Sequence, residues 1–216
     1  NTDVIIQQLN LRRLLNSFTQ DQELFAISFY QQEKAHIIAG KNRIYWEKGL
    51  FQHQRADNLE AGITAWAEGG AGLFDKEKML KLGCFDPIYS PFYWEDIDLC
   101  YRAWKAGYFI LFDPTAKTIH QHESTIGKYF SSKIKTVALR NQLIFIWKNI
   151  SDKELIGSHQ KNLGRIFFSL LKDSGLTAGK SFFQALLLLP EILKKRREQM
   201  KTYRVTDQAV LKKFNS

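Results

Sequence analysis

The chain has 216 residues, 44% of them hydrophobic, so it can bury a sizeable core and does not have the composition of a disordered chain. Its formal net charge is +9, but residues 151–216 carry 13 of the Lys and Arg against only 6 Asp and Glu. Residues 1–150 are nearly neutral, so we expect no nucleic-acid partner. Two cysteines, Cys84 and Cys100, are too few for a disulfide framework and are expected to stay reduced, as in a cytosolic protein.

The first part of the chain alternates helical and strand patterns. Apolar residues at helical spacing predict a first helix, marked by Leu11, Leu14, Leu15 and Phe18. The runs "ELFAISFY" (23–30) and "AHIIAGKNRIYWEKG" (35–49) predict a strand and then a strand–turn–strand unit. The glycine-rich run "AEGGAGLFD" (67–75) follows, and Asp75 opens a short helix that Gly83 ends.

The stretch "SPFYWEDIDLCYRAWKAGY" predicts a helix that ends at Gly107. One apolar face at the helical period is formed by Ile97, Cys100, Tyr101 and Trp104. Asp98 and Arg102 are four residues apart and are expected to pair on the polar face. Glu95 and Asp96 are more acids than a helix start needs, and large aromatic residues precede them. Adjacent carboxylates in a partly dry pocket indicate a candidate general base.

Two further strand patterns, "YFILFD" and "AKTIH", precede a long helical run, "SSKIKTVALRNQLIFIWKNI". This alternation predicts an α/β fold for the body. The tail has an amphipathic stripe formed by Leu163, Ile166, Phe167, Leu170 and Leu171. Together with the basic cluster "KKRR" (194–197), this stripe predicts a helical tail that lies on an anionic membrane surface and is too short to span it. The alternative is an ordinary core helix beside solvated charges.

The ordered series of motifs from Gly69 to His120 resembles the family 2 glycosyltransferases, especially the bacterial rhamnosyltransferase-like members. The pieces are a Gly-Gly segment, a short helix, "GCFD", an aromatic run, "EDIDLCYR", "GY", a strand with a proline, and a histidine. The resemblance implies a GT-A-like fold, with a mixed sheet and flanking helices. Residues 1–150 would be the C-terminal part of the catalytic domain, and residues 151–216 a basic amphipathic helical tail.

The same resemblance implies catalytic roles for the residues of the acidic motif. Asp96 would be the general base that takes the proton from an acceptor hydroxyl, and Glu95 would position the acceptor or tune Asp96. Gly69 and Gly70 would let the backbone come close to the substrate, although an ordinary turn would explain them equally well.

Three more side chains are candidates for substrate binding. Tyr93 and Trp94 are able to stack on a sugar ring, and core packing is an equal alternative for both. Lys128, in "HESTIGK", would reach the diphosphate of the donor.

The resemblance also implies a divalent metal, Mg²⁺ or Mn²⁺, because these hard cations prefer carboxylate ligands and neutralise a diphosphate. The opening "NTDV" matches a variant of the family's metal motif, which makes Asp3 the carboxylate ligand. His120 would complete the site, with His122 as the near alternative. On its own, a histidine at a strand end is more often an ordinary surface or core residue.

The function implied is inverting transfer of a sugar from a nucleotide-sugar donor to a saccharide or lipid-linked acceptor, in cell-surface polysaccharide synthesis. We expect a cytoplasmic enzyme, peripheral at the inner face of the cell membrane. The alternative is a non-catalytic membrane-associated module, or a fragment that is inactive because the family's N-terminal nucleotide-binding half lies outside it. A metal-dependent phosphoesterase built on "EDID" would need more metal ligands than the sequence offers.

Overall fold

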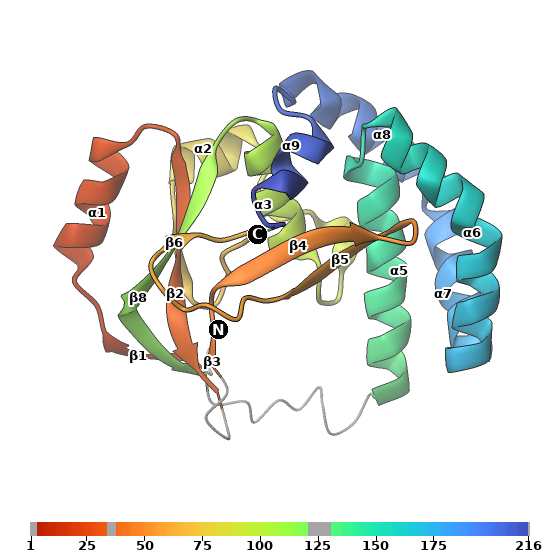
Figure 1. The fold of residues 1–216 in the computed structure, drawn as a ribbon, viewed down its shortest axis with the longest axis horizontal. Helices are drawn as coiled ribbons and strands as arrows, with labels where there is room; N and C mark the ends of the chain where they lie inside the picture. Colours follow the sequence, from red (N-terminus) through yellow and green to blue (C-terminus); the bar gives the residue numbers. More distant parts are fainter. Residues whose placement is uncertain (1–3, 34–37, 121–130, 216) are drawn as a thin grey trace.

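The computed structural model describes residues 4–33, 38–120 and 131–215, which form a mixed α/β fold (Figure 1). A six-stranded sheet has the path β1-β8-β2-β3, with β6 paired to β8 and β7 paired to β2. Its strands are β1 (Val4–Gln8), β2 (Leu24–Gln32), β3 (Ile38–Ala39), β6 (Gly62–Ile63), β7 (Gly72–Phe74) and β8 (Phe109–His120). Parallel and antiparallel neighbours both occur, so the sheet is mixed.

Strand β8 joins the sheet together, since it pairs in parallel with β2 and antiparallel with β1. Phe29 of β2 pairs with Asp113, but the next residue, Tyr30, pairs with Lys117. Residues 114–116 therefore form a bulge in β8. The two strands expected from "YFILFD" and "AKTIH" are the two halves of this one strand, on either side of the bulge.

Helix α1 (Leu11–Gln20) confirms the first predicted helix and is fixed to this bulge. The Asn10 side chain caps the helix by accepting from the backbone N–H of Arg13. The Arg13 guanidinium in turn donates to the Asp113 carboxylate and to the Thr115 hydroxyl. Leu14 faces a small apolar cluster on this side of the sheet.

A separate hairpin, β4 (Asn42–Glu47) and β5 (Leu50–Arg55), leaves the sheet and reaches toward the C-terminal helices (Figure 1). Gly49 lies in its turn with φ of 84°, and a Cβ there would be 3.0 Å from Asn162 Cβ. Phe51 is fully buried and packs on the Phe145 ring, with the ring centroids 4.5 Å apart. The hairpin is thus part of the core.

The remaining helices lie on the opposite side of the sheet from α1 (Figure 1). They are α2 (Lys76–Lys81), α3 (Glu95–Lys105), α5 (Ser131–Asn149), α6 (Lys153–Ser174), α7 (Leu176–Leu187), α8 (Leu189–Gln199) and α9 (Asp207–Lys212), with 3₁₀ turns η2 (Pro87–Tyr89) and η3 (Met200–Thr202). The main core is centred on α3 and α5, where Leu99, Tyr101 and Phe145 are buried. The expected fold class is confirmed: a mixed α/β sheet with flanking helices, followed by a helical C-terminal region.

The end of the chain packs on the helix that carries the acidic motif. The Lys105 carbonyl, at the end of α3, accepts from the backbone N–H groups of Arg204 and Val205. The buried Asp207 of α9 accepts from Lys105 Nζ at 2.7 Å and from the Tyr101 hydroxyl at 2.6 Å. Helix α9 therefore closes one end of the main core.

Two residues of the amphipathic stripe of α6, Ile166 and Phe167, pack inside the protein, as the alternative of an ordinary core helix has it. Ile166 is buried, and the Phe167 ring lies 5.3 Å from the Phe182 ring of α7. The alternative of a packed helix holds for these residues, because they cover the neighbouring helix. The Leu170 side chain lies outside the described part of the structure.

Two residues of the basic cluster make polar contacts inside the protein. Lys195 pairs with Asp86 at 3.0 Å, and Arg196 donates to the Trp147 carbonyl at 3.0 Å. Lys194 and Arg197 remain exposed. Within the described ranges, no helix combines the length and the apolar character needed to cross a membrane.

Candidate functional site

The acidic motif begins at an unusual turn. Tyr93 and Trp94 both have left-handed backbone conformations, with φ of 69° and 80°. Side chains other than glycine rarely adopt this conformation, because Cβ approaches the following carbonyl. The Trp94 carbonyl accepts the first hydrogen bond of α3, from the Asp98 N–H at 2.8 Å. The chain thus enters α3 abruptly, with Glu95 and Asp96 in the first turn.

The two predicted glycines lie opposite this helix start. The Ala71 N–H donates to the Glu68 carbonyl at 3.0 Å, which places Gly69 and Gly70 at the centre of a tight turn. The Gly69 N–H lies close enough to the Asp96 carboxylate to lower its pKa. A Cβ on Gly69 would lie 3.0 Å from Asp96 Oδ1, which is closer than ordinary van der Waals contact, so a side chain at this position would push the carboxylate away. The structure brings these predicted residues together in one site.

The electrostatics of the site suit proton transfer near neutral pH. Burial, followed by the nearby charges of Glu95 and Glu68, raises the pKa of Asp96 to about 7, against the lowering effect of the Gly69 N–H. Burial also raises the pKa of Glu95. The Glu95 Oε2 atom is buried and has no hydrogen-bond partner among the described residues. A carboxylate with a pKa near the operating pH is well matched to general acid–base catalysis.

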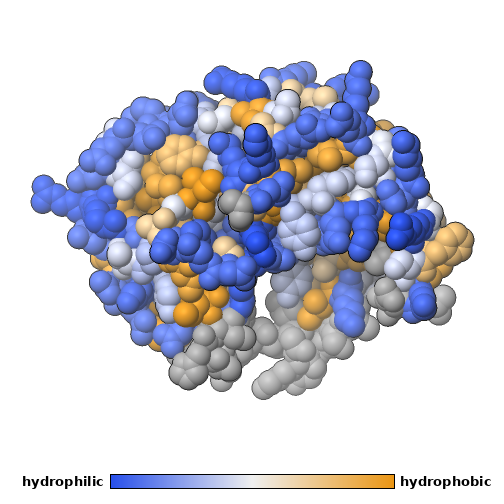
Figure 2. All heavy atoms as spheres, viewed as in Figure 1, coloured by the Kyte–Doolittle hydropathy of each residue, from blue (hydrophilic) through white to orange (hydrophobic). Residues whose placement is uncertain are grey.

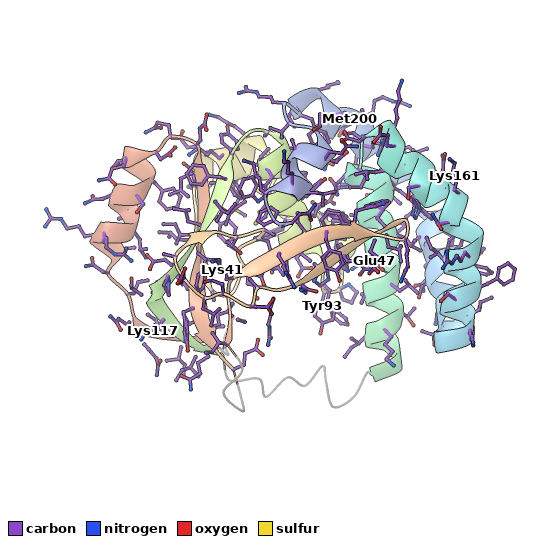
Figure 3. All side chains as sticks on the ribbon, viewed as in Figure 1. Lys41, Glu47, Tyr93, Lys117, Lys161 and Met200 are labelled. Carbon is purple, nitrogen blue, oxygen red and sulfur yellow. The ribbon has the colours of Figure 1, made fainter. Side chains whose placement is uncertain are left out.

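The two aromatic residues before the acids have different environments. Trp94 is only 6% exposed and packs on Phe145, with the ring centroids 5.1 Å apart. Its ring therefore takes the core-packing alternative and offers no face to a sugar. Tyr93 is 48% exposed and lies below the hairpin, beside α5 (Figure 3). Of the two rings, the Tyr93 ring is the one accessible to a ligand.

His53 of β5 is a neighbour of this site that the sequence did not single out. Its ring makes edge contacts with Trp94 at 5.0 Å and with Trp66 at 5.4 Å. Burial lowers the pKa of His53, which favours the neutral imidazole. A lone histidine in a hairpin has no distinguishing spacing, so its place beside Trp94 follows only from the fold.

Most of the predicted metal site lies outside the described residues. Asp3, His122 and Lys128 lie in the segments 1–3 and 121–130, which the structure does not describe. Of His120, only the backbone is described. Val4, which follows Asp3 in the chain, pairs with His120 in the antiparallel ladder of β1 and β8. Over the parts of the chain that the structure describes, no three His, Cys, Asp or Glu side chains group in a way that could hold a metal ion.

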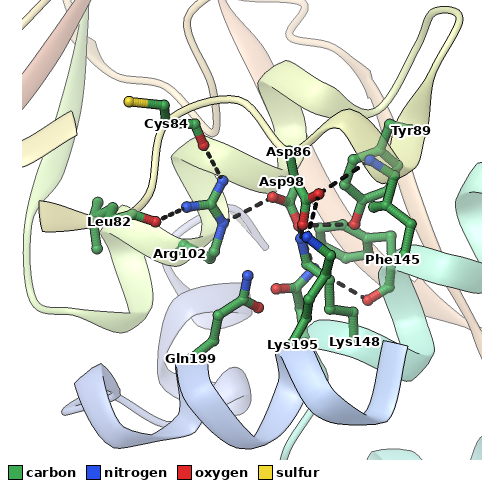
Figure 4. A network of polar contacts seen from close by, with 12 residues as sticks. Leu82, Cys84, Asp86, Tyr89, Asp98, Arg102, Phe145, Lys148, Lys195 and Gln199 are labelled. Carbon is green, nitrogen blue, oxygen red and sulfur yellow. Dashed lines mark hydrogen bonds and ion pairs between the residues drawn. The ribbon is translucent and has the colours of Figure 1, made fainter. Parts of the chain in front are cut away.

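Behind the site, a buried polar network fixes α3 to α5 (Figure 4). Asp98 accepts from Arg102 Nε at 2.8 Å, from the Tyr89 hydroxyl at 2.8 Å and from Asn149 Nδ2 at 2.7 Å, and pairs with Lys148 Nζ at 2.9 Å. Burial alone would raise the pKa of Asp98, but Arg102 and Lys148 hold it well below its usual range. The predicted Asp98–Arg102 pair forms, but both side chains are buried rather than on a solvated polar face. Their polar partners make that burial possible.

The network continues to α8. Lys148 also pairs with Asp86 at 2.6 Å, and Lys195 pairs with the other oxygen of the same carboxylate (Figure 4). Arg102 donates to the carbonyls of Leu82 and Cys84. These contacts link the loop before α3, helix α5 and the basic cluster of α8 into one rigid support for the acidic motif.

Comparisons with known proteins give limited information. No protein-family model and no curated protein matches the chain. Solved structures do match, among them a crystal structure of GalNAc-T7 with UDP, GalNAc and Mn²⁺, at 17% identity and a TM-score of 0.45 over 70% of this chain. The chain spans 32% of the length of that neighbour. A likeness at this level assigns no function.

Proposed function

We propose that the protein transfers a sugar, with inversion, from a nucleotide-sugar donor to a hydroxyl of a saccharide or lipid-linked acceptor. It would be a GT-A, family 2 type glycosyltransferase of cell-surface polysaccharide synthesis. The observation that carries the proposal is the Asp96 carboxylate, held against Gly69 and faced by the acids Glu68 and Glu95. The motif series from Gly69 to His120 supports the reaction class.

Asp96 would remove the proton from the acceptor hydroxyl as its oxygen attacks the anomeric carbon. The new bond joins that oxygen to the anomeric carbon, and the bond from this carbon to the diphosphate breaks on the opposite face. The proton ends on Asp96, and the electron pair of the broken bond leaves with the diphosphate. Glu95 would tune Asp96, whose pKa its charge raises, and the exposed Tyr93 ring would pack on the sugar.

A divalent cation, Mg²⁺ or Mn²⁺, would be held by Asp3 and His120. The pairing of Val4 with His120 fits this proposal, because it joins the strand that follows Asp3 to the end of β8. When bound, the cation would neutralise charge on the diphosphate. Lys128 would add a second positive charge there.

We also propose that the protein contacts an anionic membrane surface, through the outward side of α6 and α7 instead of the stripe predicted from the sequence. Phe168 is 71% exposed and Phe183 is 62% exposed. Hydrophobic spheres protrude among hydrophilic ones at this edge of the molecule (Figure 2). Lys161 lies on the same helix pair (Figure 3).

The charge of this helix pair suits lipid head groups of negative charge. Residues 155–190 contain a single acid, Asp173. The same segment has four bases, Lys161, Arg165, Lys172 and Lys180, all of them exposed. Exposed aromatic rings between lysines and arginines are typical of helices that lie in a membrane interface.

The reaction is tested by a screen of nucleotide sugars and acceptors on the full-length protein, with Asp96→Asn as the variant. The amide keeps the shape of the carboxylate but cannot take a proton, so turnover should fall about 10²–10⁴-fold while donor binding is retained. Asp57→Asn, at an 88% exposed side chain, is the control and should leave turnover unchanged. Turnover by Asp96→Asn at the wild-type rate would contradict the proposal.

The membrane surface is tested by co-sedimentation with anionic vesicles at low and high salt. Phe168→Asp with Phe183→Asp should reduce binding, while Leu80→Asp, at a 60% exposed position on α2, should not. Binding should also weaken with salt, because the charge contribution is screened over about 10 Å at 0.1 M. Equal binding by all variants would refute this surface. Vesicle binding without transfer from any donor would favour a non-catalytic membrane module.

A further inference from the structure

We propose that Asn141 is a positioning residue, which holds the turn of residues 89–94 from α5 and so fixes where the Asp96 carboxylate lies against Gly69. The proposal rests on the role of Asp96 proposed above. Asn141 is fully buried in α5, just before the buried apolar residues Leu143, Ile144, Phe145 and Ile146.

Both the nitrogen and the oxygen of the Asn141 amide are hydrogen-bonded. All of the bonds that the nitrogen donates go to residues 89–93. Its Nδ2 donates to the carbonyls of Tyr89 at 2.7 Å, Phe92 at 3.0 Å and Tyr93 at 2.9 Å. An amide nitrogen has two N–H groups, so one of them is shared between two carbonyls. Its Oδ1 accepts from Arg140 Nε at 2.9 Å. An apolar residue would fill the same space without these bonds, so packing alone does not account for asparagine here.

The bonds are made where the backbone needs support. Tyr93 and Trp94 hold left-handed conformations that disfavour any residue with a Cβ. Asn141 binds the carbonyl of Tyr93 directly, and Arg140 adds a bond from its guanidinium to the Ser90 carbonyl. Asp96 follows Trp94 by two residues, so the direction of this turn sets the direction of the first turn of α3.

The same helix holds the segment at its other end. Lys148 lies seven residues, or two helical turns, after Asn141 and therefore on the same face of α5. It pairs with both Asp86 and Asp98, on either side of the turn. Lys148 thus holds the segment on both sides of the turn, and Asn141 holds the residues between, 89–94.

The test follows the position of Asp96 without requiring turnover. The Asp96 carboxyl carbon is titrated by ¹³C NMR in the 216-residue chain, with Asp96→Asn for assignment. Glu95 and Glu68 are the charged groups that act on Asp96, and the Gly69 N–H and the buried Cys100 complete its surroundings. We expect a midpoint near 7 in the wild type. In Asn141→Ala the midpoint should fall by at least about one pH unit toward the ordinary aspartate value, because the released turn exposes the carboxylate.

Gln142→Ala is the matched control. Gln142 is the next residue on α5, and its Nε2 also donates to a buried segment, at the Phe51 carbonyl 2.9 Å away. Its loss removes an amide and a hydrogen bond without touching the turn, so the Asp96 midpoint should not move. Arg140→Ala, a milder change on the partly exposed side, is run in parallel in case Asn141→Ala does not fold.

The outcomes separate the two proposals. An unmoved midpoint in either folded variant, or an equal shift in Gln142→Ala, would overturn the positioning role. In a protein with measurable transfer, Asn141→Ala should lower kcat about 10²-fold with little change in KM, since misplacement by about 1 Å has that effect. A shifted midpoint together with turnover by Asp96→Asn at the wild-type rate would support the positioning role and refute Asp96 as the base.

Discussion

Replacing Asp98 by Asn tests whether the buried network supports the fold. The carboxylate has four polar partners, and its loss leaves Arg102 and Lys148 buried at 2% and 0% exposure without their shared counter-charge. Removing one partner of a buried ion pair typically destabilises a protein by about 3–5 kcal/mol. Lys148 keeps Asp86 as a partner, so we expect the lower half of this range, about 3–4 kcal/mol.

The assay is urea unfolding followed by circular dichroism at pH 7. Asp57→Asn is the control, because Asp57 pairs with Arg43 at 3.3 Å on the surface and such pairs contribute about 0–1 kcal/mol. A loss below about 1 kcal/mol for Asp98→Asn would refute the reasoning, since it would mean that the buried cations find equivalent partners.

The difference in unfolding free energy between wild type and Asp98→Asn should depend on pH in a defined direction. The pKa of Asp98 is lower in the folded state than in the unfolded state, so its contribution is complete above the unfolded value of about 3.9. It is lost as the pH falls through the folded value. The stability difference between wild type and Asp98→Asn should therefore stay constant from neutral pH to about pH 5 and shrink below about pH 4.

The raised pKa of Asp96 means that folding favours its protonated form, so stability is lost as pH rises from about 3.9 through about 7. Asp96→Asn should thus be more stable than wild type at pH 8 and equal to it at pH 4, as measured by thermal unfolding; equal stability at both would contradict the burial of Asp96. Gly69→Ala would place a Cβ 3.0 Å from Asp96 Oδ1 and should lower turnover about 10²-fold, whereas Gly164→Ala, in open space on α6, should not. Asp207→Asn leaves the buried Lys105 without its counter-charge, so the free energy of unfolding should drop by about 3–5 kcal/mol in urea titrations; an unchanged value would show that Lys105 finds an equivalent partner.

Local patterns predicted the elements of this protein well. The apolar spacing of α3 depends on residues within three turns of one another, and the structure has that helix with its expected buried face. The pairing of Asp98 with Arg102 was predicted for the same reason. Its burial was not, because Lys148 and Asn149 come from α5, about fifty residues further along the chain. No spacing in the sequence connects the two segments.

Sequence spacing also could not predict the contacts of the site or the buried side of α6. The order of motifs singles out both Gly69 and Asp96, but it does not predict that they touch, since the two residues are brought together by the tertiary fold. Phe167 and Phe168 are adjacent in the sequence, yet one packs on α7 and the other is exposed. Helix α6 has apolar residues on more than one side, so periodicity could not decide which side faces the protein.

The bulge at residues 114–116 separates β8 into two segments that lie next to different parts of the protein. The first segment follows α3 and its acids, and the second ends at His120 beside Val4. Removing one residue from the bulge would move everything beyond it by about 3.3 Å along the strand and turn each side chain to the opposite face of the sheet. In the proposed site, the length of this short spacer would set how far His120 lies from the acidic motif. Insertions and deletions here would retune that distance in whole-residue steps that no substitution can reproduce.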